Sequence, residues 1–184
     1  MFLLDGKRLT PGNAFEHNGI QYPANWLNFA SLAEKEAIGI EEVSEQSRPN
    51  DEYYWVTDNN NGTFSSTAKS LNDREEVDRD NNPLYVQVWD SETETMVNTS
   101  KRLVAKGLKS TKVAQIKATA NSLLSNTDWM VIRKAERDVA IPSATVTYRA
   151  AVITEATRLE TAINAATTVE ALITVVQSQN WPKE

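Results

Sequence analysis

The stretch VITEATRLETAINAA, residues 152–166, decides the fold class of the C-terminal half of this chain. Its apolar residues recur at spacings of four, three, four and three, the heptad pattern of a helix that packs along one narrow face. These residues are Val152, Ala156, Leu159, Ile163 and Ala166. We therefore expect an α-helix over about residues 143–165. An isolated helix of this length is marginal in water, so either neighbouring helices of the chain or another protein chain must cover its apolar face.

Further helices are expected on both sides of this stretch. The spacing of apolar residues predicts a helix over residues 101–125. The sequence SNTD at residues 125–128 then predicts that this helix ends, and that a second helix begins with Thr127 as its N-cap and extends to about residue 138. A capping pattern at Thr167 predicts a last helix that extends to about residue 177.

The first half of the chain has the features of short strands and tight turns. Asp5-Gly6 and Asn18-Gly19 are turn dipeptides, because these residue types tolerate positive φ angles. Ser31 and Glu34 have the spacing of a capping box, which predicts a helix of about two turns that Gly39 can end. Strands are expected at residues 2–4, 52–56, 63–67 and 84–89, a surface loop or linker at residues 69–82, and a further polar segment at residues 90–100.

These patterns together predict an α+β protein of two modules. A small strand-and-turn module is expected over residues 1–98, and a helical module over residues 99–184. The boundary is placed in the polar segment 90–100. A chain of 184 residues is long enough to bury a core of ordinary size.

Charge is distributed unevenly between the two halves. Residues 1–100 carry seven basic and 18 acidic side chains, whereas residues 101–184 carry 12 basic and seven acidic ones, and the net charge is −6. The segment 101–117 holds six basic residues and no acidic one. The run indicates either a solvated helix face or a region that docks on an oppositely charged surface. Nucleic-acid binding is disfavoured, because no aromatic residue lies among these cations and the pI is about 5.0.

The composition leaves little for catalysis or for a metal. The chain has no cysteine and a single histidine, His17, and it lacks the glycine-rich phosphate-binding motifs. Asp78, Asp80 and Asn82 match the start of an EF-hand loop, but Pro83 stands where the loop needs glycine. We predict no enzymatic activity, no catalytic residue, no cofactor and no metal. No signal peptide or membrane-spanning stretch is evident, so we expect synthesis in a cytosol.

Two segments resemble proteins of tailed bacteriophages. Residues 15–27 (FEHNGIQYPANWL), continuing through residues 37–40 (AIGI), resemble the N-terminal module of small tail-associated proteins. Residues 123–129 (LLSNTDW), with Arg133, Pro142 and residues 148–152 (YRAAV), are similar to the C-terminal helical signature of tail-fibre and tail-fibre-assembly proteins. In that family a Thr-Asp-Trp helix start precedes a Tyr-Arg helix, and a Trp-Pro pair lies near the C-terminus, as Trp181-Pro182 does here.

The resemblance implies a non-enzymatic structural component of a phage virion, in the tail, fibre or baseplate region, that mediates attachment between larger tail parts. It would be made in the host cytoplasm and reside in the virion. Its partners would be other tail or fibre proteins, with a homo-oligomer as a further option and with neither nucleic acid nor membrane. One alternative is a tail-fibre assembly chaperone. Another is a carbohydrate-binding or carbohydrate-processing module at a fibre tip, with stacking surfaces at Trp26, Tyr53, Tyr54, Trp55 and Trp89.

The candidate residues for interaction and scaffolding come from both lines of reasoning. We expect Trp129 to fold its ring beneath the preceding helix, and Tyr148 and Arg149 to close that corner through hydrogen bonds or stacking. The apolar face of the 143–165 helix supplies the rest. The full set is Trp26, Trp129, Tyr148, Arg149, Val152, Ala156, Leu159 and Ile163.

Overall fold

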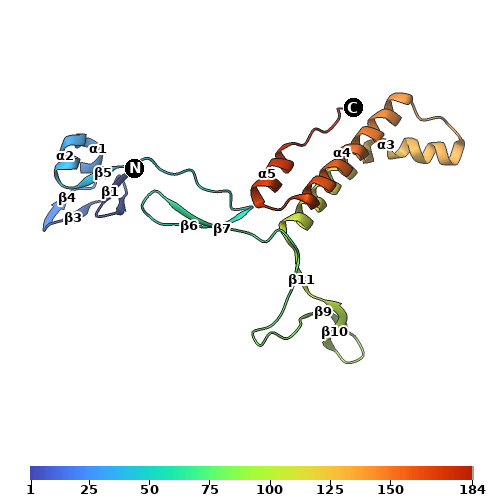
Figure 1. Ribbon diagram of the computed structural model, residues 1–184, viewed down its shortest axis with the longest axis horizontal. Coiled ribbons are helices and arrows are strands. Elements are labelled where there is room, and N and C mark those ends of the chain that lie inside the picture. The colour runs from blue at the N-terminus through green and yellow to red at the C-terminus, as the bar shows by residue number, and fades with distance from the viewer. Residues whose placement is uncertain (184) are drawn as a thin grey trace. The chain divides into compact units, whose positions relative to one another are not determined.

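The computed structural model describes residues 1–183 and divides the chain into two compact units, one from Met1 to Ala68 and one from Lys69 onward. Strands dominate the first half and helices the second, as Figure 1 shows, so the predicted α+β class is confirmed. The division at residues 68/69 lies well before the boundary expected at 98/99. Segment 69–107 is attached to the helices because the backbone N–H groups of Leu108 and Lys109 donate to the carbonyl oxygens of Ser70 and Leu71.

The first unit is built from short antiparallel strands and two short helices. Strands β1 (Phe2–Leu4), β2 (Lys7–Leu9) and β5 (Ile40–Glu42) form a sheet in the order β2-β1-β5. Strands β3 (Phe15–His17) and β4 (Ile20–Tyr22) form one hairpin, and β6 (Tyr54–Asp58) and β7 (Phe64–Ala68) form another. Helices α1 (Trp26–Phe29) and α2 (Leu32–Ala37) connect β4 to β5.

Local sequence signals explain the turns and the helix start in this unit. Asp5 and Gly6 have φ angles of 51° and 73°, and Asn18 and Gly19 have 50° and 77°, as the two turn dipeptides require. The predicted capping box is present, because the Ser31 hydroxyl accepts the Glu34 N–H while the Glu34 carboxylate accepts the Ser31 N–H. The core of this unit forms around the buried residues Leu4, Leu27 and Ile40, with Phe2, Leu9, Phe15, Trp26 and Ile38 packed against them.

The second unit begins with four strands in two antiparallel pairs. Strand β8 (Arg74–Glu75) pairs with β11 (Val104–Ala105), and β9 (Tyr85–Asp90) pairs with β10 (Thr95–Arg102) in a two-stranded ribbon. The sequence predicted β9 and a polar segment over residues 90–100 as the boundary between the modules, but it predicted no strand there, whereas residues 95–100 belong to β10. The polar side chains of β10 lie in a strand because β9 supplies backbone hydrogen-bond partners along it.

Three helices complete this unit: α3 (Leu108–Arg137), α4 (Ser143–Ala165) and α5 (Val169–Gln177). The predicted bounds of the 143–165 helix agree with α4, and Figure 1 shows α4 running alongside α3. Helix α5 begins one residue later than its capping pattern predicted, because the Thr168 hydroxyl accepts the Ala171 N–H. None of the helices in residues 1–183 is both long and apolar enough to cross a lipid bilayer.

The structure corrects the prediction that two helices occupy residues 101–138. Residues 101 and 102 belong to β10, and α3 then continues without interruption from Leu108 to Arg137. Thr127 is not an N-cap. Its hydroxyl donates to the carbonyl oxygen of Leu124 within the helix, at 3.0 Å. Residues of the SNTD sequence therefore satisfy their polar groups inside a continuous helix, and no break is needed.

Candidate interaction site

Arg149 is the residue that joins α4 to the middle of α3. Its guanidinium group donates to the carbonyl oxygen of Leu124 at 2.9 Å, to the hydroxyl of Thr127 at 2.7 Å and to the carboxylate of Asp128 at 2.9 Å. The Thr127 side chain is 1% exposed, so the charged group on α4 satisfies a polar group that the helix pair buries. Such charge-assisted contacts fix the position of one helix along the other.

Tyr148 packs beside this contact. Its side chain is buried with those of Ala120 and Val152, and its hydroxyl lies 3.5 Å from the carbonyl oxygen of Leu123. Tyr148 and Arg149 therefore contact α3 through hydrogen bonds, but they close no corner between two helices, because α3 is continuous at this point. The segments LLSNTDW and YRAAV therefore meet at this point. Arg149 contacts Leu124, which lies 25 residues earlier in the chain.

The apolar face of α4 is covered within the chain. Val152, Leu159 and Ile163 are all 0% exposed. Ala156 packs, together with Leu123, Leu124 and Trp181, against the buried cluster that contains Val152. Two further contacts align α3 with α4: Lys117 forms an ion pair with Glu160 at 2.8 Å, and Lys109 donates to the carbonyl oxygen of Asn164 at 2.9 Å. The sequence left open whether helices of this chain or another protein chain cover the apolar face, and in the structure other segments of this chain cover it.

The C-terminal segment adds contacts on α4 from the α5 side. Arg158 donates to the carbonyl oxygen of Ser178 at 3.0 Å, and the Asn180 N–H donates to the carboxylate of Glu155 at 2.8 Å. Arg158 and Glu155 also pair with each other, and the Arg158 guanidinium is the main cause that lowers the pKa of the Glu155 carboxyl. The helices and the end of the chain therefore form one scaffold.

Trp129 does not lie beneath the preceding helix, as predicted, but is 51% exposed. The reason is helical geometry. Trp129 follows the buried Thr127 by two residues in an unbroken helix, and two residues rotate a side chain by about 200° around the axis. The guanidinium group of Arg133 lies over the indole ring at 4.8 Å from its centroid, and Ile132, at one turn from Trp129, is 56% exposed. The surface formed by Trp129, Ile132 and Arg133 is called the Trp129 surface below.

Trp26 has a structural place in the first unit. Its ring meets Tyr22 edge-on at 4.9 Å and Phe15 at 5.9 Å, while Phe15 and Tyr22 stack at 4.8 Å. This cluster holds α1 on the β3–β4 hairpin. Among the other aromatic residues considered for stacking, Tyr53 is 6% exposed, whereas Trp55 and Trp89 are 68% and 62% exposed and belong to different units.

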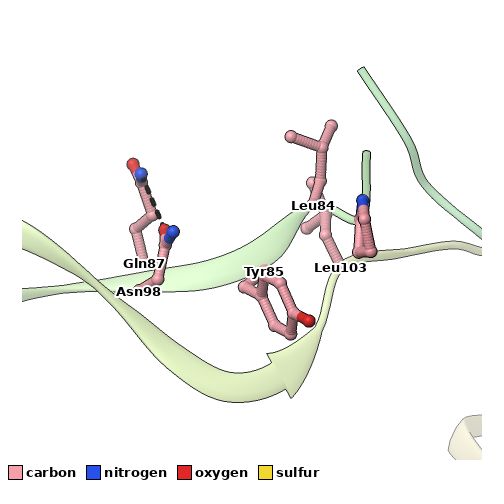
Figure 2. Close-up of a pocket in the computed structure, with 6 residues that line it drawn as sticks. Leu84, Tyr85, Gln87, Asn98 and Leu103 are labelled. Carbon is pink, nitrogen blue, oxygen red and sulfur yellow. Dashed lines mark hydrogen bonds between the residues drawn. The ribbon is translucent and has the colours of Figure 1, made fainter. Parts of the chain in front are cut away.

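The β9–β10 ribbon bears apolar side chains that the sequence analysis did not select as interaction residues. Val88 and Met96 are 46% and 53% exposed. At the base of the ribbon lies an open hollow of about 360 Å³, shown in Figure 2. Its lining consists of Pro83, Leu84, Tyr85, Gln87, Asn98 and Leu103. Gln87 donates to the Asn98 side chain at 3.1 Å, so the polar pair in this hollow is satisfied internally.

The basic run 101–117 is not a simple solvated helix face. Arg102 pairs with Glu75 at 3.3 Å and lies over the Tyr85 ring, and Lys112 is only 4% exposed. Lys106 donates to Asp73 at 2.8 Å. These basic side chains take part in internal contacts that attach the strands and α4 to α3.

Asp73 anchors the start of α3. It accepts hydrogen bonds from the Lys106 ammonium, from the Ser110 side chain and, at 2.8 Å, from the Gly107 N–H. These groups stabilise the carboxylate and lower its pKa to about 2, the contact with Lys106 first among them. Asp78, from the EF-hand-like run, instead accepts the N–H groups of Asp80 and Asn82 and closes its own loop. Within residues 1–183, no three His, Asp or Glu side chains are grouped so that they could hold a metal ion.

No family model matches this sequence, and no curated protein or solved structure is significantly similar to it.

Proposed function

We propose that this protein is a non-enzymatic structural component of a tailed-phage virion, located in the tail, fibre or baseplate region, where it mediates attachment between larger tail parts. The observation that carries the proposal is the contact of Arg149 with Leu124, Thr127 and Asp128. It joins the two segments on which the resemblance to tail-fibre and tail-fibre-assembly proteins rests. Trp129, the next residue of the same motif, is left half-exposed at that junction.

The arrangement suits a protein that binds by surface contact. The helix pair is held by buried apolar residues and by the Arg149 contacts, so it presents the Trp129 surface on a fixed support. Tryptophan and arginine are the residues that most often dominate the energetics of protein interfaces. The partner in this proposal is another tail or fibre protein, and the Trp129 surface is the contact.

Quantitative mass spectrometry of purified particles of the encoding phage tests this proposal. We expect the protein at a fixed copy number per particle. The variant Trp129→Ala, on α3, should be depleted from particles although it folds. The control Ile153→Ala removes an exposed apolar side chain from a different helix, α4, and should be retained.

Two other outcomes favour one of the alternatives, and a third would exclude the Trp129 surface. Abundance in infected cells together with absence from particles would favour a tail-fibre assembly chaperone and would overturn the structural proposal. Glycan cleavage by the purified protein would favour the carbohydrate-processing module. Equal retention of the Trp129→Ala and Ile153→Ala variants would show that the Trp129 surface is not the contact.

A further inference from the structure

Arginine side chains lie over aromatic rings in both units of this protein, and two of these arginines also have a carboxylate partner. Arg48 lies over an aromatic ring at 5.6 Å from its centroid and pairs with Asp51 at 3.0 Å. Arg102 lies over the Tyr85 ring at 5.5 Å and pairs with Glu75 at 3.3 Å. In each case the ring supports the flat guanidinium group while the carboxylate balances its charge.

Arg133 has the aromatic ring but lacks the carboxylate. Its guanidinium group lies 4.8 Å from the centroid of the Trp129 ring, and among residues 1–183 it has neither a hydrogen bond nor an ion pair. The Nε–H is buried without an acceptor, whereas the terminal NH2 groups are not among the buried atoms and are open to solvent. A guanidinium group held on a ring in this way is preorganised to pair with a carboxylate from outside the chain.

The carboxylates closest in sequence do not balance the charge of Arg133. Asp128 and Asp138 each pair with another cation. Glu136, which follows Arg133 by three residues, forms no ion pair with it in the structure. Arg137, one turn further along α3, is exposed and has no ion pair within the described part of the chain either. This end of α3 therefore presents two arginines whose charges the chain leaves unpaired.

We propose that the Trp129 surface binds an acidic segment of another tail protein, with an aspartate or glutamate of that segment paired to Arg133. An apolar side chain of the same segment packs on Trp129 and Ile132, which are 51% and 56% exposed. This inference rests on the proposed function, because it takes the Trp129 surface as the contact and adds the chemistry of the partner. The partner's carboxylate supplies at Arg133 what the chain itself supplies at Arg48 and Arg102.

A protein carboxylate fits this surface better than a nucleic-acid phosphate does. Affinity for nucleic acid comes from many cations that neutralise successive phosphates, whereas two unpaired arginines lie at this end of α3. A phosphate backbone would also meet the exposed carboxylates of Asp128, Glu136 and Asp138. Tryptophan and arginine side by side are instead typical of the centre of a protein–protein interface.

Charge reversal at Arg133 tests the pairing in purified particles of the encoding phage, with quantitative mass spectrometry as the readout. Arg133→Glu sets like charges against each other, so its copy number per particle should fall at least about tenfold. Lys101→Glu, on β10, is the matched control. It makes the same change in net charge at another exposed cation and should be incorporated like the wild type. Circular dichroism of both purified variants checks that they fold.

A solution measurement on the wild-type full-length protein is independent of any role in a virion. The probes are the peptide acetyl-Glu-Leu-Glu-amide and its neutral analogue acetyl-Gln-Leu-Gln-amide, each at about millimolar concentration. We expect the acidic peptide alone to shift the NMR signals of the Trp129 indole N–H and the Arg133 Nε–H. The Nε–H signal of Arg102, whose guanidinium group already pairs with Glu75, should stay in place as the internal control.

The two tests separate the chemistry of the partner from the proposed function. Depletion of Trp129→Ala together with retention of Arg133→Glu would leave the proposed function standing and overturn the acidic partner. Equal shifts with the two peptides would overturn it as well. Absence of the wild type from particles would overturn the proposed function, and the peptides would then decide whether this surface takes an acidic segment.

Sedimentation equilibrium of the wild type covers the remaining occupant. The first unit of a second copy also carries exposed carboxylates, such as those of Glu41 and Glu42. A dimer that Arg133→Glu dissociates and Lys101→Glu does not would make a second copy the occupant and overturn the assignment to another tail protein. A monomer that responds to the acidic peptide supports the proposal.

Discussion

The apolar face of α4 and the apolar residues of the β9–β10 ribbon belong to the same unit but differ in solvent exposure. Val152, Leu159 and Ile163 on α4 are fully buried, whereas Val88, Trp89 and Met96 on the ribbon are about half-exposed. Helix α4 has α3 on one side and the α5 segment on the other, while β9 has β10 alone. The comparison shows that burial depends on how many neighbours the chain itself supplies, and apolar spacing does not reveal that number.

The largest expected effect comes from removing a side chain from the α4 face. Leu159→Ala should lower the free energy of unfolding by about 2–5 kcal/mol, because it leaves a cavity at a fully buried position. Ile153→Ala, on the same helix but 54% exposed, should change it by less than about 0.5 kcal/mol. Chemical denaturation followed by circular dichroism measures both. Similar effects for the two variants would contradict the internal cover of α4.

The next largest effect concerns the contact that aligns α3 and α4. Arg149→Met should lower the free energy of unfolding by about 1–3 kcal/mol, because it removes hydrogen bonds to Leu124 and to the buried Thr127 hydroxyl. Arg137→Met, at the exposed end of α3, is the control and should be nearly neutral. If both variants unfold at the same denaturant concentration, the Arg149 contact does not stabilise the helix pair.

A smaller effect is expected at Trp129, where the structure and the sequence-based expectation disagree. A buried tryptophan would cost about 3–5 kcal/mol on replacement by alanine. For the half-exposed Trp129, the Trp129→Ala variant should lose only about 1 kcal/mol, from the cation–π contact with Arg133 and partial packing. Thermal melting distinguishes the two values, and a large loss would place the indole in a core.

The last prediction concerns acid pH and the segment that joins the ribbon to α3. The Asp73 carboxyl has a pKa of about 2, below its usual 3.8, because Lys106, Ser110 and the Gly107 N–H stabilise its charge. Its contribution to stability is therefore present above pH 3.8 and is lost as the pH falls toward 2. A carboxyl titration by NMR should give the low pKa. In the Asp73→Asn variant, the free energy of unfolding should depend less on pH between about 2 and 3.8. An Asp73 titration at the usual pKa would show that this carboxylate does not anchor α3.

Features that depend on neighbouring residues in sequence could be predicted well. The turns at Asp5-Gly6 and Asn18-Gly19, the capping box at Ser31 and the bounds of α4 all agree with the structure. Positive φ angles, cap hydrogen bonds and helical periodicity are local properties, so short stretches of sequence encode them.

Features that depend on a distant partner could not be predicted in this way. The SNTD sequence has the residues of a helix start, yet α3 continues through it because Thr127 bonds within the helix and receives Arg149 from α4. The polar residues of β10 gave no strand signal, because the strand exists through its pairing with β9. At the interaction site, Tyr148 and Arg149 were expected to form hydrogen bonds at a corner between two helices, and they form them with a continuous helix instead. The exposure of Trp129 was not predicted, since it follows from the continuity of α3.

The sequence by itself determined the α+β class, the helices α2, α4 and α5, and the helical face from Val152 to Ala166. Only the tertiary structure decided that α3 and the α5 segment cover that face, that the ribbon is joined to the helical unit and that Trp129 lies at the surface. The physical reason is that an amphipathic pattern indicates which side chains are apolar, whereas the packing of distant segments decides which of them become buried.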